Sequence, residues 1–275
     1  MKSLVRVGVF FGITFVFTII LVIVQQALGI DTDKISLPQF GPGFAAIVML
    51  MVFRSDGVKL TITFKGIPFL KYLGAIGIPI VVPVILFLVY NQFIDPLSIP
   101  TIDTSSLLIF LGGILLGAFG EELGWRGYAQ KLLERNLNGL IAFLVVGVLW
   151  GLWHVGNFQH GLTYMLFFVF STVGYSAVMA WLLQGTTYNV VLATLFHFAV
   201  NVGFYILQNA MADLRLVALN GLVWIGAAFV VFALNRKDFL QFGQKTQKDG
   251  LEKHHPSAVV QITDTPDAGR QRENQ

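Results

Sequence analysis

Two adjacent carboxylates, Glu121 and Glu122, lie in an apolar stretch where charged residues are costly. They follow the run LLIFLGGILLGAFG and precede LGWRGYAQKLLER, in which apolar residues continue at helical spacing. Two carboxylates in one buried turn cannot both ionise without compensation. Arg126 is four residues after Glu122, so the two share a helix face and can pair. Glu121 points about 100° away with no cation nearby in the sequence, and it is therefore available for chemistry.

Two histidines and an amide could join Glu121. His154 lies near the end of the apolar segment GLIAFLVVGVLWGLWHV, and His197 lies within VVLATLFHFAVN. Asn201 follows His197 by four residues and shares its helix face. Glu121 and His154 are equally distant from the turn at 136–139, so antiparallel helices joined there place both side chains at one depth. We expect His197 and Asn201 to reach the same depth from the following loop.

This set of side chains is suited to hydrolysis of an amide bond. A carboxylate beside an imidazole can hold and deprotonate a water molecule, and a second imidazole with an amide can donate hydrogen bonds to a developing oxyanion. Glu121, His154 and His197 also form a ligand set typical of catalytic zinc, so a divalent metal is an alternative to the absence of any cofactor. The helical HExxH signature, the GxSxG motif and cysteine are absent from the sequence.

The elements that would position these residues are membrane helices. Of the 275 residues, 55% are hydrophobic and 12% are charged, against about 25% charged in an ordinary soluble domain. This composition excludes a cytosolic enzyme, a nucleic-acid-binding protein and a disulfide-stabilised secreted domain. We predict an all-α fold, a polytopic membrane helix bundle with about eight transmembrane helices. The predicted spans are 7–29, 38–53, 67–93, 105–135, 139–156, 161–184, 188–208 and 214–234.

Glycines predict close packing around Glu121. Gly113 with Gly117, and Gly120 with Gly124, form two small-xxx-small pairs on the segment that carries this carboxylate. Such pairs allow the backbones of two membrane helices to approach closely. They are typical of membrane helices in general and do not by themselves indicate a function.

The basic residues predict the orientation and the domains. With a cytoplasmic N-terminus, only Lys34 and Arg215 of the 18 Lys and Arg residues fall outside, as the positive-inside rule requires. The N- and C-termini would then be cytoplasmic, and the site would open to that side. We predict a multi-pass protein of a prokaryotic plasma membrane. Residues 1–234 should form the bundle, with the site-bearing core at about 105–205, and the polar residues 235–275 a disordered cytoplasmic tail.

The order of the motifs resembles that of a known family. The chain is similar to the CPBP family of intramembrane endopeptidases, which includes CAAX prenyl proteases and bacterial Abi and bacteriocin-immunity proteins. The resemblance extends from Leu107 to Gly203; each motif alone is weak, but the ordered set is specific. Trp150 stands where the family more often has Phe. The motifs are, in chain order, Glu121-Glu122-x-x-x-Arg126, Trp150-x-x-x-His154 and His197-x-x-x-Asn201.

The resemblance implies a role for each of these residues. Glu121 would be the general base on the attacking water, and His154 would orient that water. His197 and Asn201 would stabilise the oxyanion. The family has been described both as metalloproteases and as glutamic proteases, and an amide one turn from His197 favours the metal-free type. The residues implied to structure the site are Glu122, Arg126 and Trp150.

The resemblance leaves the substrate and two other classes of function open. The expected substrate is a membrane-associated peptide or protein in the lipid bilayer, for which prenylated CAAX proteins are the family example. A catalytically silent immunity or scaffold protein would keep the fold and use the Glu and His side chains to brace helices. A small transporter could use the same groups as a proton relay. Against a transporter, the sequence shows no repeated pair of broken spans.

Overall fold

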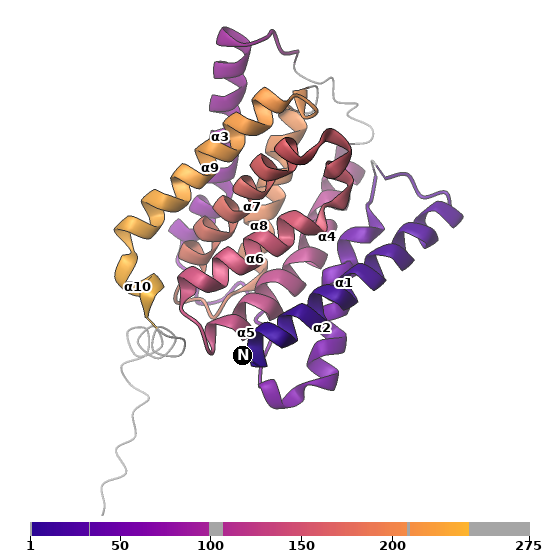
Figure 1. Ribbon diagram of the computed structural model, residues 1–275, viewed down its shortest axis with the longest axis vertical. Coiled ribbons are helices and arrows are strands. Elements are labelled where there is room, and N and C mark those ends of the chain that lie inside the picture. The colour runs from indigo at the N-terminus through magenta and orange to yellow at the C-terminus, as the bar shows by residue number, and fades with distance from the viewer. Residues whose placement is uncertain (1, 33, 99–106, 208–209, 242–275) are drawn as a thin grey trace, which may run out of the picture.

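A computed structural model describes residues 2–32, 34–98, 107–207 and 210–241, and these residues are helices joined by turns and loops (Figure 1). Outside this part of the chain lie the first two residues of the predicted span 105–135, the last residue of the predicted span 188–208, and most of the predicted tail. The helices are α1 (Lys2–Ala27), α2 (Gly41–Val52), α3 (Phe69–Phe93), α4 (Leu107–Gly124), α5 (Lys131–Glu134), α6 (Gly139–Trp153), α7 (Leu162–Leu183), α8 (Val190–Ile206), α9 (Leu214–Leu234) and α10 (Arg236–Leu240).

The helices confirm the predicted all-α membrane bundle. Within the described residues, five helices are long and apolar enough to cross a bilayer, the third of them being the continuous stretch Leu107–Glu134. Three shorter apolar helices, Leu37–Val52, Gly139–Trp153 and Val190–Ile206, coincide with the other predicted spans. The number of helices that cross the bilayer and their orientation stay predictions.

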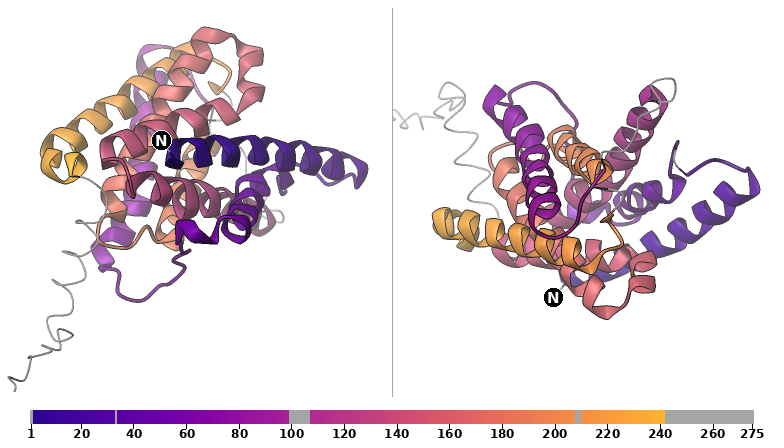
Figure 2. Two further views of the ribbon diagram at one scale, coloured as in Figure 1. Left: turned by 60° about the horizontal axis from the view of Figure 1, so that its bottom comes forward. Right: turned by 90° about the horizontal axis from the view of Figure 1, so that it is seen from above.

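Helix α7 lies at the centre of the bundle, and α1 lies at its edge. Of the 18 most apolar consecutive residues, two thirds are buried in α7 and 17% are buried in α1. Helix α1 runs past the other helices in Figure 2. Small residues bring the neighbours of α7 close. A Cβ on Gly174 would lie 2.4 Å from the backbone oxygen of Trp224 in α9, and one on Gly147 of α6 would lie 2.6 Å from Val173 Cα. Buried α7 is therefore a rigid support for the helices around it.

The glycines of α4 receive the segment 34–43, which precedes and begins α2. A Cβ on Gly113 would lie 1.8 Å from the backbone oxygen of Lys34, and one on Gly124 would lie 2.5 Å from Pro42 Cβ. Only glycine permits such an approach of two backbones. The close packing predicted from the spacing of these glycines is therefore present, and its partner is a segment that contains a short 3-10 helix, Leu37–Phe40.

The N-terminus, α5 and α10 lie at the same end of the bundle, the lower end in Figure 1. Arg126, which carries one of the 18 basic side chains, is fully buried inside the helix bundle. The tail was expected to be disordered from 235, but Arg236–Leu240 form α10, because Phe239 is buried against the ring of Phe143 at a centroid distance of 5.3 Å. The rest of the tail, from 242 on, lies outside the described residues.

We expect Gly174→Ala to destabilise the bundle by about 1–3 kcal/mol, because the added methyl group meets the backbone of α9 and overpacks the interface. Gly226→Ala in α9 is the matched control, since no atom lies within 4 Å of its added Cβ. Thermal unfolding of the purified proteins in detergent measures both changes. Equal unfolding temperatures for the two variants would contradict the proposed packing of α7 on α9.

Candidate functional site

Glu121, Glu122 and Arg126 are fully buried on one continuous helical stretch. The stretch continues from α4 through a π-helical turn, Trp125–Gln130, into α5. Such turns are rare in proteins, and many of those that occur lie at functional sites. The helix therefore continues through the two carboxylates, as predicted, but with a local widening directly after them that the sequence did not indicate.

Glu122 and Arg126 form the ion pair predicted from their spacing. Arg126 Nη1 donates to Glu122 Oε1 at 2.9 Å, and Arg126 Nη2 donates to Ser176 Oγ of α7 at 2.8 Å. His197 Nδ1 of α8 also donates to Glu122 Oε1, at 2.9 Å. The carboxylate of Glu122 thus joins three helices through a cation, an imidazole and, by way of Arg126, a hydroxyl group.

Glu121 has different partners, both of them neutral. Gln39 Nε2 donates to its Oε1 at 3.0 Å, and Trp150 Nε1 of α6 donates to its Oε2 at 2.8 Å. Each oxygen of this carboxylate therefore accepts one hydrogen bond from an amide or an indole. Phenylalanine, which the resembled family more often has at the position of Trp150, could not donate such a bond.

Trp150 connects the other predicted residues. Its backbone oxygen accepts a hydrogen bond of 2.9 Å from His154 Nδ1, and its ring lies 5.0 Å from the ring of His197 and 4.4 Å from the guanidinium carbon of Arg126. The rings of His154 and Trp150 also lie 6.2 Å apart between their centroids. The hydrogen bond fixes Nδ1 as the donor nitrogen of His154, which makes Nε2 the acceptor when the ring is neutral.

The structure thus brings six of the seven predicted residues into one network of contacts. Asn201 is half-buried one helical turn after His197, and no hydrogen bond joins it to the other predicted residues, all of which lie in the described part of the chain. Gln39 and Ser176 complete the network, and the sequence analysis did not identify them. Neither residue belongs to a spaced motif, so the sequence carries no specific signal for them.

The metal alternative depends on how Glu121, His154 and His197 lie relative to one another. Within the described ranges, no three His, Cys, Asp or Glu side chains lie close enough together to hold a metal ion. The hydrogen bonds of His154 and His197 are made by Nδ1, to a carbonyl and to a carboxylate, so Nε2 is the ring nitrogen that each could offer to a metal. The chemistry below is derived for the side chains themselves.

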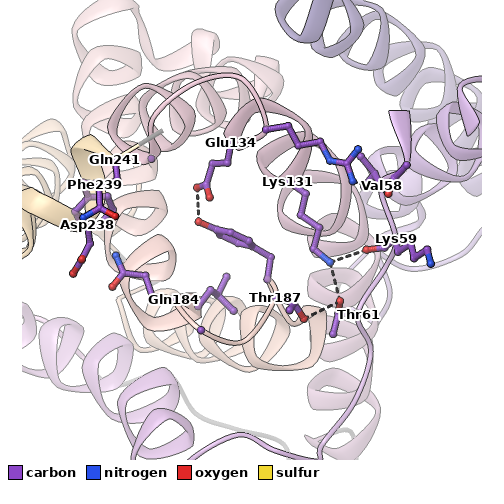
Figure 3. Close-up of a pocket in the computed structure, with 16 residues that line it drawn as sticks. Val58, Lys59, Thr61, Lys131, Glu134, Gln184, Thr187, Asp238, Phe239 and Gln241 are labelled. Carbon is purple, nitrogen blue, oxygen red and sulfur yellow. Dashed lines mark hydrogen bonds between the residues drawn. The ribbon is translucent and has the colours of Figure 1, made fainter. Parts of the chain in front are cut away.

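A cavity of about 360 Å³ lies apart from this network, at the end of the bundle near α5 (Figure 3). None of the predicted site residues lines it. Lys131 Nζ donates to the backbone oxygen of Lys59 and to Thr61 Oγ1, at 2.8 and 2.9 Å. Tyr188 donates to Glu134, and burial raises the pKa of this phenol well above its usual value, which keeps it a neutral donor. Lys131 is ten residues, or about 15 Å along the helix, from Glu121.

An all-helical bundle with apolar exposed faces and a buried Glu, His and Arg network defines a helical membrane protein with an intramembrane polar site. Residues 103–203 match the family model described as Type II CAAX prenyl endopeptidase Rce1-like. This match contains every predicted site residue and confirms the resemblance to the CPBP endopeptidases that the motifs predicted.

Curated relatives carry the name lysostaphin resistance protein A. The protein of Staphylococcus epidermidis is 29% identical over 91% of this chain and 67% of its own length. Those of Staphylococcus haemolyticus and Staphylococcus aureus are each 26% identical, over 82% and 81% of this chain and 64% and 56% of their own lengths. The chain thus spans between about half and two thirds of the length of these bacterial relatives.

We expect Arg126→Met to destabilise the protein by about 3–5 kcal/mol, because it leaves the buried carboxylate of Glu122 without its cation. The double variant Glu122→Gln/Arg126→Met removes both charges and should be more stable than Arg126→Met alone. Thermal unfolding of the wild type, Glu122→Gln, Arg126→Met and the double variant gives the coupling energy between the two side chains. Simply additive losses would show that the two side chains do not depend on each other.

Proposed function

We propose that this chain is an intramembrane endopeptidase that hydrolyses a peptide bond with a water molecule activated by Glu121. The observation that carries the proposal is the arrangement at Glu121: a buried carboxylate that no cation in the described part of the chain bonds, in the same network as His154 and His197. Its location inside the segment that matches a family of endopeptidases supports the same conclusion. A carboxylate held only by neutral donors keeps lone pairs that can accept a proton from water.

The first step is attack of water on the carbonyl carbon of the substrate. Glu121 takes one proton of the water, and His154 Nε2 accepts a hydrogen bond from the other. A C–O bond forms, and the carbonyl oxygen becomes an oxyanion that His197 and Asn201 stabilise. His197 donates Nδ1–H to Glu122, so it can donate through Nε2 only as an imidazolium.

The second step is cleavage of the C–N bond. Glu121 returns its proton to the leaving nitrogen, so that the products are a carboxylic acid and an amine and the carboxylate is restored. Glu122 and Arg126 take no part in proton transfer. They hold His197 and α4 in place through the bonds at Glu122 Oε1.

The substrate class and the setting follow from the membrane location of the site. The substrate of this proposal is a peptide bond in a membrane-anchored or membrane-inserted segment, presented from the cytoplasmic side. The bundle 1–234 would act in the plasma membrane of a bacterium. Cleavage near a hydrophobic or lipid-anchored C-terminal segment is the expected pattern.

A second candidate is a catalytically silent membrane protein with a protective role. The relatives are named for resistance to lysostaphin rather than for hydrolysis of a peptide. In such a protein the Glu and His side chains would only connect helices. The two candidates differ in whether a carboxylate at Glu121 is needed, because glutamine preserves its shape and most of its hydrogen bonding.

We expect Glu121→Gln to lower cleavage of a membrane-anchored peptide by about 10²–10⁴-fold, the usual contribution of a general base. The assay uses purified protein in liposomes with a library of such peptides, with and without a chelator. Glu134→Gln, the same substitution on the same helical stretch, is the control and should keep its activity. Activity that survives the chelator in the wild type and is lost in Glu121→Gln indicates a metal-free glutamic peptidase.

Other results of this assay decide between the remaining alternatives. Loss of wild-type activity with the chelator would indicate a metal that Glu121 helps to hold. Full activity of Glu121→Gln would contradict the role of this residue. A folded wild-type protein that cleaves no library peptide would favour the silent protective protein.

The orientation can be tested with single cysteines, because the natural chain contains none. Thr32 and Ser55 are both exposed, and they lie at opposite ends of the segment formed by the 3-10 helix and α2. We expect Thr32→Cys to react with a membrane-impermeant maleimide in intact cells, and Ser55→Cys to react only after the membrane is opened. The reverse pattern would place the N-terminus outside and contradict a site open to the cytoplasm.

A further inference from the structure

Gln39 contacts the proposed catalytic carboxylate from outside the family segment. Its Nε2 lies 3.0 Å from Glu121 Oε1, although the two residues are 82 positions apart in the chain. Glu121 is fully buried, whereas Gln39 is only half-buried. The amide therefore covers one oxygen of the carboxylate from the periphery of the bundle, opposite the oxygen that Trp150 holds.

The amide of Gln39 lies directly on Gly117, where a side chain would displace it. A Cβ on Gly117 would lie 2.0 Å from Gln39 Oε1 and 2.6 Å from its Cδ. At Gly120, one turn further along α4, a Cβ would lie 3.1 Å from the backbone oxygen of Gln39. The glycines of α4 thus provide the space for both the backbone and the amide of this residue.

The segment that carries Gln39 is held in place independently of Glu121. Gln25 of α1 is buried, and its Nε2 donates to the backbone oxygens of Ile30 and Ile35 at 3.2 and 3.0 Å. Its Oε1 accepts a hydrogen bond of 2.8 Å from the backbone nitrogen of Leu37, two residues before Gln39. The side chain of Gln25 therefore closes the loop between α1 and the 3-10 helix, and it fixes the start of the helix that carries Gln39.

We propose that Gln39 is a positioning residue for Glu121: with Trp150, it fixes the plane of the carboxylate by one hydrogen bond on each oxygen. This inference rests on the proposed function. A donor on Oε1 leaves one lone pair of that oxygen for water and sets the direction in which it points. A base must be held within about 0.5 Å of its productive position to act efficiently. Both donors are neutral groups, so the two bonds orient the carboxylate without placing a cation against it.

The first test removes the donor and preserves the size of the side chain. Gln39→Met has a similar length but no N–H group. We expect it to lower kcat about tenfold for the library peptide that the wild type cleaves fastest, and to leave KM almost unchanged, because the lost hydrogen bond is to a charged group that acts in the chemical step. A rise in KM with unchanged kcat would instead assign Gln39 to substrate binding and overturn the inference.

The second test moves the amide without changing Gln39. Gly117→Ala should displace the flexible amide and lower kcat to a similar extent. Gly112→Ala on the same helix is the matched control, since no atom lies within 4 Å of its added Cβ, and its kcat should stay at the wild-type value. The double variant Gln39→Ala/Gly117→Ala should have the same kcat as Gln39→Ala alone, because the amide that the methyl group at 117 would displace is no longer there. Additive losses of kcat would overturn the inference.

These outcomes separate failure of the inference from failure of the proposed function. If the wild type cleaves and Gln39→Met cleaves equally well, the inference fails while the function stands. If the wild type cleaves no peptide, the proposed function fails, and thermal unfolding of the cycle Gln39→Met, Glu121→Gln and their double variant still tests the contact. Non-additive changes in that cycle support a direct bond between the two side chains, and additive changes overturn it.

Discussion

The buried ion pair between Glu122 and Arg126 is the interaction on which the site depends. Both side chains are completely covered, and an unpaired charge there would cost several kcal/mol. Their partners come from other helices. Ser176 on α7 accepts a hydrogen bond from Arg126, and His197 on α8 donates one to the carboxylate oxygen of Glu122 that also binds Arg126. Because each of these bonds compensates a buried charge, α4, α7 and α8 are held in one relative position at this depth.

The two neighbouring glutamates have opposite environments, and the helix itself produces the difference. Consecutive residues point about 100° apart, so Glu122 faces the cation while Glu121 faces Gln39 and Trp150. The carboxylate of Glu122 is paired with the guanidinium of Arg126 at 2.9 Å and has a structural role. A carboxylate held by neutral dipoles carries no such pairing. One helical turn therefore supplies both a structural carboxylate and one suited to chemistry.

Local features of the site could be predicted from the sequence, and distant ones could not. The apolar segments predicted the helices because length and hydropathy decide what crosses a bilayer. Spacing predicted the Glu122–Arg126 pair because residues four apart meet on a helix. Gln39 and Ser176 gave no such signal, since a single amide or hydroxyl in an apolar run is common and its partner is set by tertiary packing. For the same reason, the sequence did not indicate that His197 bonds Glu122.

The network also divides into a charged part, which lies wholly in the matched segment, and a neutral part around Glu121, to which Gln39 contributes from outside that segment. Glu122, Arg126 and His197 all lie within the segment that matches the endopeptidase family, whereas Gln39 lies in the packed segment before α2. Changing the charged part would expose a buried charge and threaten the fold. Changing Gln39 would alter only how Glu121 is held, because the segment 34–43 is anchored separately by Gln25 and by the glycines of α4. The N-terminal segment is thus the part of this architecture in which a substitution can change the hydrogen bonding of Glu121 while the buried ion pair stays intact.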